Sequence, residues 1–220
     1  MFRQIHTEPS DYANERHEMV RMQLRNRGID DQRVLEAMER VPRHEFVPHE
    51  YRSRSYGDHP IPIGEGQTIS QPFIVALSLQ ALALSGSERV LEVGTGSGYQ
   101  TALLAALSQM VYSLERHAAL ARQAEEILTR MHLENVKVII GDGSHGLREF
   151  APFNAILVSA AAPAIPPSLL EQLFELGKMV LPVGPPDSQE LQLITKIGGG
   201  PVMQVLEGCR FVPLIGTEGY

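Results

Sequence analysis

The chain has 220 residues, a formal net charge of −7 at pH 7 and a single cysteine. The negative balance excludes a broadly basic, duplex-binding surface, and one cysteine excludes an internal disulfide or a cysteine-only zinc site. No apolar stretch approaches the ~18 residues of a membrane span, and the first residues lack the apolar core of a secretion signal. We therefore expect a soluble, cytoplasmic protein with a single domain over residues 1–220.

The first third of the chain predicts a helical lead-in followed by a long loop. Residues 1–13 are polar and predict a flexible arm. Within residues 14–71, one helix pattern covers Met19–Leu24 and ends at Gly28, and a second follows a cap at Asp30 or Asp31 and stops before Pro42. The remaining residues, 43–71, show no clear period. An irregular stretch of that length is typical of a lid or a binding loop.

Residues 72–220 predict the body of the domain, in which short apolar strands alternate with helices. The expected strands cover residues 89–93, 111–115, 136–140, 155–158 and 179–181, and helices are expected from about residues 72, 99, 120 and 168, the last ending before Gly177. Such alternation predicts a doubly wound α/β fold with a mostly parallel sheet. Two further strands, at residues 191–197 and 203–214, have no helix between them, so we expect them to pair antiparallel at a sheet edge.

A glycine-rich turn lies between the first strand and its helix, where doubly wound sheets bind nucleotides. Its spacing is G-x-G-x-G rather than the G-x-G-x-x-G of dinucleotide sites. The acid before it, Glu92, would repel a pyrophosphate but suits a cationic ligand such as S-adenosylmethionine, which carries a sulfonium and an ammonium group. The residues assigned to this ligand are Glu92, Gly94, Thr95, Gly96, Ser97 and Gly98.

Two more acids end the next two strands. Glu115 is placed to accept the ribose hydroxyls, and Asp142, followed by Gly143, is placed near the adenine amine. Each acid alone is equally typical of a solvated strand end or a turn. Three acids at three successive strand ends, however, predict a pocket for S-adenosylmethionine and its product S-adenosylhomocysteine, in a Rossmann-like methyltransferase domain.

The motifs for several methyl acceptors are absent. The fourth strand is followed by Ser159 and three alanines instead of the Asn/Asp-Pro-Pro-aromatic motif of amine methyltransferases, and Cys209 alone cannot support a two-cysteine mechanism. The histidines show no metal spacing, so no metal is expected. A methyltransferase acting on RNA or a small molecule stays an alternative, as does a binding protein without turnover.

Five segments resemble the protein-L-isoaspartate O-methyltransferase family, and the similarity runs from about Met19 to Leu214. They are Ile63–Pro72, Val90–Ala102, Gly141–Gly143, Leu181–Gly184 and Arg210–Leu214. The segment Gly-Gln-Thr-Ile-Ser-Gln-Pro is specific, whereas the glycine turn is shared with many methyltransferases.

This resemblance implies methylation of the free α-carboxylate of L-isoaspartyl residues in damaged proteins, which starts repair through a succinimide. It implies that Ser70 is the active-site serine, that Thr68 contacts substrate and that Val212 offers backbone bonds to it. Isoaspartyl proteins and peptides are then the partners, with no nucleic acid and no membrane, and the enzyme is expected to be a monomer. Asn154, and Ser144 with His145, depart from the family pattern.

Overall fold

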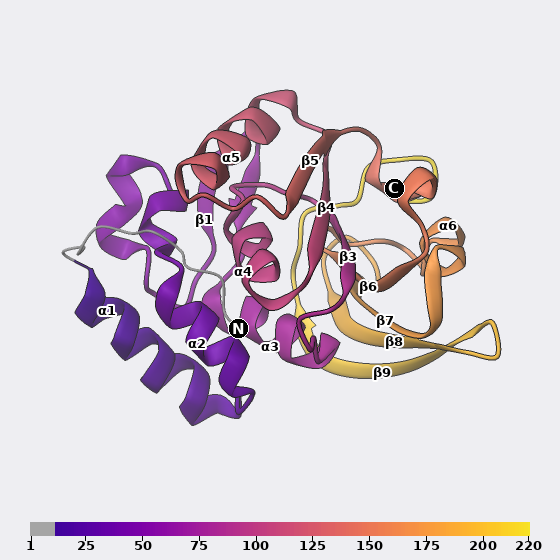
Figure 1. Cartoon of the computed structure of the whole chain (residues 1–220), viewed down its shortest axis with the longest axis horizontal. Helices are drawn as coiled ribbons and strands as arrows, with labels where there is room; N and C mark the ends of the chain where they lie inside the picture. Colours follow the sequence, from indigo (N-terminus) through magenta and orange to yellow (C-terminus); the bar gives the residue numbers. More distant parts are fainter. Residues whose placement is uncertain (1–11) are drawn as a thin grey trace.

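The computed structural model describes residues 12–220, and its main feature is a seven-stranded sheet in the order β5-β4-β3-β6-β7-β8-β9 (Figure 1). The first five of these strands along the chain pair in parallel, and β8 and β9 pair antiparallel. Their bounds are β3 Arg89–Val93, β4 Met110–Glu115, β5 Val136–Ile140, β6 Phe153–Val158, β7 Leu173–Val183, β8 Gln189–Ile197 and β9 Gly200–Cys209. The predicted mostly parallel, Rossmann-like fold is confirmed.

The sheet has a hydrophobic core on each face. Side chains alternate along a strand, so Val90 packs into one core while Leu91 packs into the other. The larger core also contains apolar residues of α3 (Pro72–Leu82), α4 (Tyr99–Leu107) and α5 (Ala118–Arg130), and the smaller one contains Leu169 of α6 (Pro167–Glu171). Burial on both faces explains why these strands are continuous apolar runs in the sequence.

The lead-in packs into the larger core. Helix α1 (Ala13–Glu18) continues through a π-helical turn, Met19–Leu24, and a 3-10 turn, Arg25–Arg27, before Gly28 ends it with φ 91°. Helix α2 (Gln32–Arg40) is capped by Asp31, whose carboxylate accepts bonds from the backbone N–H groups of Arg33 and Val34. Residues 1–11 of the expected arm lie outside the described residues.

Residues 43–71 are more ordered than the absence of periodicity suggested. Two 3-10 turns, Arg43–Phe46 and His49–Arg54, precede an antiparallel hairpin of β1 (Ile61–Gly64) and β2 (Gln67–Ile69). The strands are too short to show a period, but the hairpin turn has the glycines it needs: Gly64 and Gly66 both have positive φ.

Two predicted boundaries are wrong. The helix expected from Ser168 to Gly177 ends at Glu171, because Leu173 already pairs with Phe153 at the start of β7. The last strand, expected over residues 203–214, runs from Gly200 to Cys209. Beyond it the chain crosses to the end of β6, where Ala161 donates a bond to the carbonyl of Val212 and accepts one from the N–H of Leu214.

Candidate active site

From β3 the chain adds strands toward β5 on one side of the sheet, and from β6 it adds strands toward β9 on the other side. The loops after the neighbouring strands β3 and β6 therefore lead away from each other. The loop after β3 is the glycine turn, and β6 leads into Ser159. Open α/β sheets bind ligands at such a switch point, outside the carboxyl ends of the strands. Three adjoining cavities lie here, and all three are lined by Thr68 and Ser159.

The glycine turn requires its glycines. Gly94, Gly96 and Gly98 have φ of 95°, 54° and 87°, which residues with a Cβ adopt only with strain. The N–H groups of Gly94 and Thr95 donate to the carbonyl of Leu114 in β4, which holds the turn against the sheet. Gly94 and Gly96 line the cavity beside Glu115, which we call the glycine-loop cavity, and Ser97 lines the narrower cavity beside it.

Glu92 lies beneath this turn and does not line any of the three cavities. Its side chain is fully buried, and its carboxylate accepts hydrogen bonds from Thr101 (2.5 Å), Ser113 (2.6 Å) and Gln100 (3.2 Å). Burial raises the pKa of Glu92 to about 7, against the lowering effect of these three donors. Gln100 does line a cavity, so Glu92 is linked to the site by the hydrogen bond from Gln100.

Glu115 is the predicted acid that faces the glycine-loop cavity directly. One carboxylate oxygen accepts from the N–H of Gly96 and the other from the N–H of His117, both at 2.9 Å. These bonds fix its orientation, and each oxygen retains a lone pair for a further donor. The glycine turn and the end of β4 therefore form one polar wall of the glycine-loop cavity.

The next predicted pair, Asp142 and Gly143, meets the glycine-loop cavity only through Gly143. Gly143 lines it, and a Cβ on that residue would overlap Cγ1 of Val93. Asp142 accepts from the backbone N–H (2.9 Å) and the hydroxyl (2.8 Å) of Ser144, so the departure at Ser144 adds one side-chain donor to the acid.

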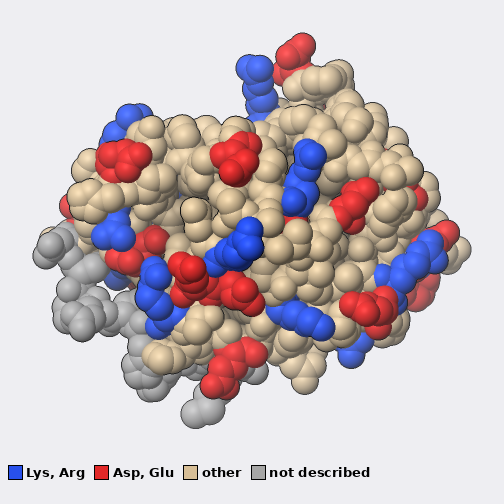
Figure 2. All heavy atoms as spheres, turned by 90° about the horizontal axis from the view of Figure 1, so that it is seen from above, with Lys and Arg blue, Asp and Glu red and all other residues tan. Residues whose placement is uncertain are grey.

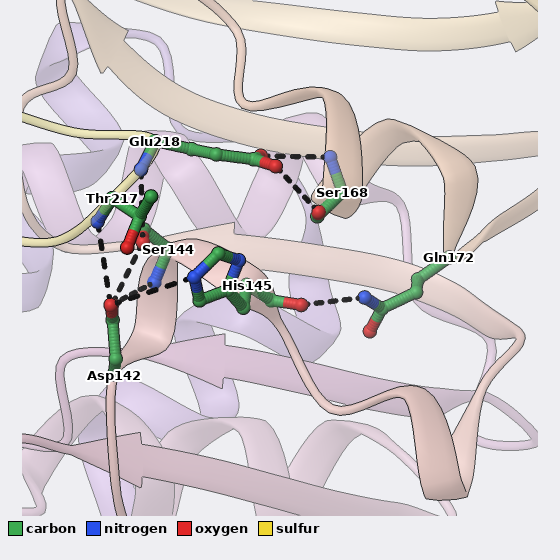
Figure 3. A network of polar contacts seen from close by, with 7 residues as sticks. All are labelled: Asp142, Ser144, His145, Ser168, Gln172, Thr217 and Glu218. Carbon is green, nitrogen blue, oxygen red and sulfur yellow. Dashed lines mark hydrogen bonds and ion pairs between the residues drawn. The ribbon is translucent and has the colours of Figure 1, made fainter.

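The carboxyl-terminal residues fold back over Asp142, as Figure 3 shows. The N–H of Thr217 donates to the second carboxylate oxygen of Asp142, and the N–H of Glu218 donates to the hydroxyl of Ser144. The carboxylate of Glu218 in turn accepts from the N–H and hydroxyl of Ser168 at the start of α6. Since Leu214 and Ile215 line the cavity, this tail forms part of its wall.

Ser70 lies where two cavities meet. It lines the narrow cavity together with Gln100, and it also lines a larger one that we call the Ser70 cavity. Thr68 borders both of these and the glycine-loop cavity, and Val212 borders the Ser70 cavity and the glycine-loop cavity. The structure thus brings together all three residues that the sequence assigned to substrate.

The sequence did not identify Ser159 as a site residue. It follows β6, lines all three cavities and accepts a 2.6 Å hydrogen bond from Gln100. A signal was present, because Ser159 occupies the same strand-end position as Glu115 and Asp142. The sequence also missed two arginines: Arg27 lines the Ser70 cavity and pairs with Asp58, and buried Arg43 donates to the carbonyl of Ser70 at 2.8 Å.

Cys209 is half-buried and lines the Ser70 cavity, so it is less enclosed than the small core residue expected. Burial raises the pKa of its thiol to about 11, which keeps it neutral near pH 7. Asn154, the other departure from the family pattern, accepts a 2.9 Å bond from the N–H of Arg89 at the start of β3.

Charge on the surface is mixed. On the face drawn in Figure 2, lysine and arginine side chains alternate with acids and form no continuous basic patch. Within residues 12–220 there is no helix long and apolar enough to cross a membrane, and no group of three histidine, cysteine or acidic residues that could hold a metal.

Known proteins match this chain over almost its full length, and they carry the same name. The family model "Protein-L-isoaspartate(D-aspartate) O-methyltransferase (PCMT)" matches residues 14–219. The protein-L-isoaspartate O-methyltransferase of Koribacter versatilis is 52% identical over 209 residues, covering 95% of this chain and 94% of that protein. That of Methanoculleus marisnigri is 50% identical over 206 residues, with 94% of both chains covered.

A solved structure from Plasmodium falciparum, described as a protein-L-isoaspartate O-methyltransferase in complex with S-adenosyl-L-homocysteine, superposes with a TM-score of 0.79 at 32% identity. The match covers 91% of this chain and 98% of that one. These matches give no support to an RNA or small-molecule substrate. The chain that holds this glycine turn, these strand-end acids and the Ser70 segment therefore belongs to the protein-L-isoaspartate(D-aspartate) O-methyltransferase family.

Proposed function

We propose that this chain transfers the methyl group of S-adenosylmethionine to the free α-carboxylate of L-isoaspartyl residues in damaged proteins and peptides. The product ester closes to a succinimide, which reopens in part to normal aspartate. The observation that carries this proposal is the position of Ser70 and Thr68 at the junction of the narrow cavity with the Ser70 cavity. A nucleophile held there would face a methyl donor held at the glycine turn.

The residues around the glycine turn fit S-adenosylmethionine. When bound, this cofactor supplies an electrophilic methyl group on a positively charged sulfur. Gly94 to Gly98 allow close approach of the backbone, Glu115 offers free lone pairs, and the closeness of Val93 excludes any side chain at position 143. We assign cofactor binding to these residues and to Glu92, which acts through Gln100, and to Asp142.

The substrate needs no general base. The α-carboxyl of an isoaspartyl linkage resembles a free α-carboxyl group, with a pKa of ~3.3–3.7, so it is ionised and nucleophilic at neutral pH. Catalysis is then a matter of orientation, which supplies ~7–11 kcal/mol in well-aligned reactions. The reaction therefore needs no side chain that transfers a proton. The thiol of Cys209, which stays neutral near pH 7, is consistent with this.

Ser70 orients the carboxylate. Its hydroxyl can donate to one carboxylate oxygen and leave the other free to react, and it lacks the adjacent base that a nucleophilic serine needs. The backbone of Ser70 is held in place because the guanidinium of Arg43 donates a hydrogen bond to the Ser70 carbonyl. Thr68 and the backbone of Val212 contact the flanking substrate atoms.

Selectivity for isoaspartate must be geometric, because the side chain of normal aspartate is also ionised at neutral pH. The isoaspartyl linkage places an extra methylene in the backbone and moves the free carboxylate relative to it. A site that fixes the substrate backbone at Val212 and the carboxylate at Ser70 therefore distinguishes the two without reading side chains.

One assay tests the proposal. An isoaspartyl peptide and its normal aspartyl counterpart are incubated with S-adenosylmethionine that carries a radiolabelled methyl group. We expect base-labile label on the isoaspartyl peptide alone. Label on neither peptide, with S-adenosylhomocysteine binding confirmed by calorimetry, would overturn the proposal.

We further propose that the enzyme acts as a monomer in the cytoplasm and binds neither nucleic acid nor membranes. The net charge of −7 and the single cysteine support this proposal. Sedimentation at micromolar concentration tests the first part, and retention of label transfer in the presence of excess RNA tests the second.

A further inference from the structure

Within residues 12–220, the outermost strand, β9, ends the seven-stranded sheet with one edge unpaired, at the opposite end from β5 (Figure 1). Edge strands in stable proteins are usually protected by charged residues, proline or a covering element. Here Pro201 stands at one end and Glu207 at the other, and the five residues between them, Val202–Leu206, carry no charge. The side chains of Val202, Met203 and Val205 are 53%, 60% and 54% exposed.

This edge leads directly into the Ser70 cavity. The last residues of β9, Glu207 to Cys209, line that cavity, as do the next three, Arg210 to Val212. A substrate chain bound at Ser70 and Val212 therefore leaves the cavity beside the free edge of β9. The unprotected edge is continuous with the substrate site, and that continuity identifies its occupant.

The backbone of β9 has a donor available at the cavity. Gly208 lies opposite Glu190 of β8, and its N–H donates to the carboxylate of its own neighbour Glu207 at 3.2 Å. This contact is local and exposed, so an incoming carbonyl replaces it at little cost. A Cβ at Gly208 would meet no other atom within 4 Å, so the face of the sheet is open at this residue.

We propose that the free edge of β9 is a docking strand for the substrate protein: an extended, apolar segment flanking the isoaspartyl residue adds to the sheet by β-augmentation. Main-chain hydrogen bonds provide affinity in this binding mode with little dependence on side-chain sequence. The preferred substrates are then proteins whose damaged residue lies in a locally unfolded, uncharged stretch. The inference rests on the proposed function and adds the chemistry of the flanking segment.

Peptide length provides the test. A short isoaspartyl peptide that fills only the Ser70 cavity is compared with peptides that extend it by about seven alternating apolar residues on one flank or the other, which adds about 23 Å of strand. The wild-type enzyme should show at least tenfold higher kcat/KM for one of the long peptides, through a lower KM.

Charges placed on the edge should remove this advantage. In Val202→Lys/Val205→Lys, kcat/KM for the long peptide should fall to that for the short peptide, while turnover of the short peptide and Tm stay unchanged. The matched control is Val202→Thr/Val205→Thr, which keeps β-branched side chains without charge and should retain most of the advantage. As a second variant, Gly208→Pro removes the backbone donor and should lower the long-to-short ratio, whereas Gly208→Ala should not.

Two results would overturn the inference. One is equal kcat/KM for short and long peptides in the wild type. The other is a wild-type dimer that becomes a monomer in Val202→Lys/Val205→Lys with no change in length dependence, because the edge would then pair two copies of the chain. In both cases the short peptide is still methylated, so failure here is distinct from failure of the proposed function.

Discussion

The side-chain amide nitrogen of Gln100 lies 2.6 Å from the hydroxyl oxygen of Ser159 and 3.2 Å from a carboxylate oxygen of Glu92, and it donates to both. Gln100 lies in the first turn of α4, immediately after the glycine turn, and Ser159 follows β6. One amide therefore connects the two loops that diverge at the switch point of the sheet.

Gln100→Leu should weaken cofactor binding. The change removes the hydrogen bonds from Gln100 to Ser159 and to Glu92, so Glu92 keeps only the donors Thr101 and Ser113. The glycine turn is then no longer connected to the end of β6 through this amide. We expect the Kd for S-adenosylhomocysteine to rise about tenfold, which corresponds to about 1.4 kcal/mol. Titration calorimetry measures this, with Gln109→Leu as an exposed control; an unchanged Kd would refute the role of the amide.

Ser70→Ala should lower catalysis and leave cofactor binding intact. Loss of one oriented hydrogen bond to the carboxylate should reduce kcat for an isoaspartyl peptide by about 10-fold to 100-fold. The Kd for S-adenosylhomocysteine should stay within about twofold, well under 1 kcal/mol. Ser53→Ala, at an exposed serine, is the control. Full turnover in Ser70→Ala would remove the serine from the mechanism.

The pKa of about 7 at Glu92 predicts a pH-dependent stability. The reference value is 4.5, so between pH 4.5 and 7 the folded state holds a proton that the unfolded state has lost. Stability from this group is fully present below pH 4.5 and declines as pH rises through 7, by about 3 kcal/mol.

Glu92→Gln should abolish this decline. Urea unfolding between about pH 4.5 and pH 8 should show a free energy of unfolding that falls more steeply in the wild type than in the variant. Glu125→Gln, at an exposed acid, should follow the wild-type curve. Parallel curves for wild type and Glu92→Gln would contradict the raised pKa.

Gly143→Ala should destabilise the protein through a steric overlap that a second change can relieve. The new methyl group would meet Cγ1 of Val93, and overpacking of a core costs about 1–3 kcal/mol. The double variant Val93→Ala/Gly143→Ala should recover part of this loss, so the two changes are not additive. Thermal unfolding of the two single variants and the double variant measures the coupling. Strict additivity would show that the cost arises elsewhere.

Glu218→Ala should loosen the carboxyl-terminal tail. The variant loses both hydrogen bonds to Ser168. These bonds hold the segment that covers Asp142 and that includes Ile215, which lines the glycine-loop cavity. Amide hydrogen exchange should accelerate at Thr217 and at Ser144, and the Kd for S-adenosylhomocysteine should rise. Glu175→Ala, which instead removes bonds to Gly198 and Gly199, is the control for loss of a surface acid.

The parallel body of the fold and the candidate residues at its strand ends could be predicted from the sequence. Apolar runs, glycines and strand-end acids are local features, and parallel strands necessarily bring Glu115 and Asp142 to the same edge of the sheet. The specific segment from Gly66 to Pro72 likewise predicts Ser70 and Thr68 as substrate contacts, and the motif at residues 210–214 predicts Val212.

The way in which these residues are arranged around the cavities depends on contacts between distant segments. Glu92 precedes the glycine turn in the sequence, but its side chain is buried beneath the turn and meets the site only through its hydrogen bond from Gln100. Ser159 and Arg43 become site residues because distant segments pack against them, and the tail covers Asp142 through a return of the chain across β6. Non-local pairing of this kind leaves no period in the sequence, which is also why the ends of α6 and β9 were misplaced.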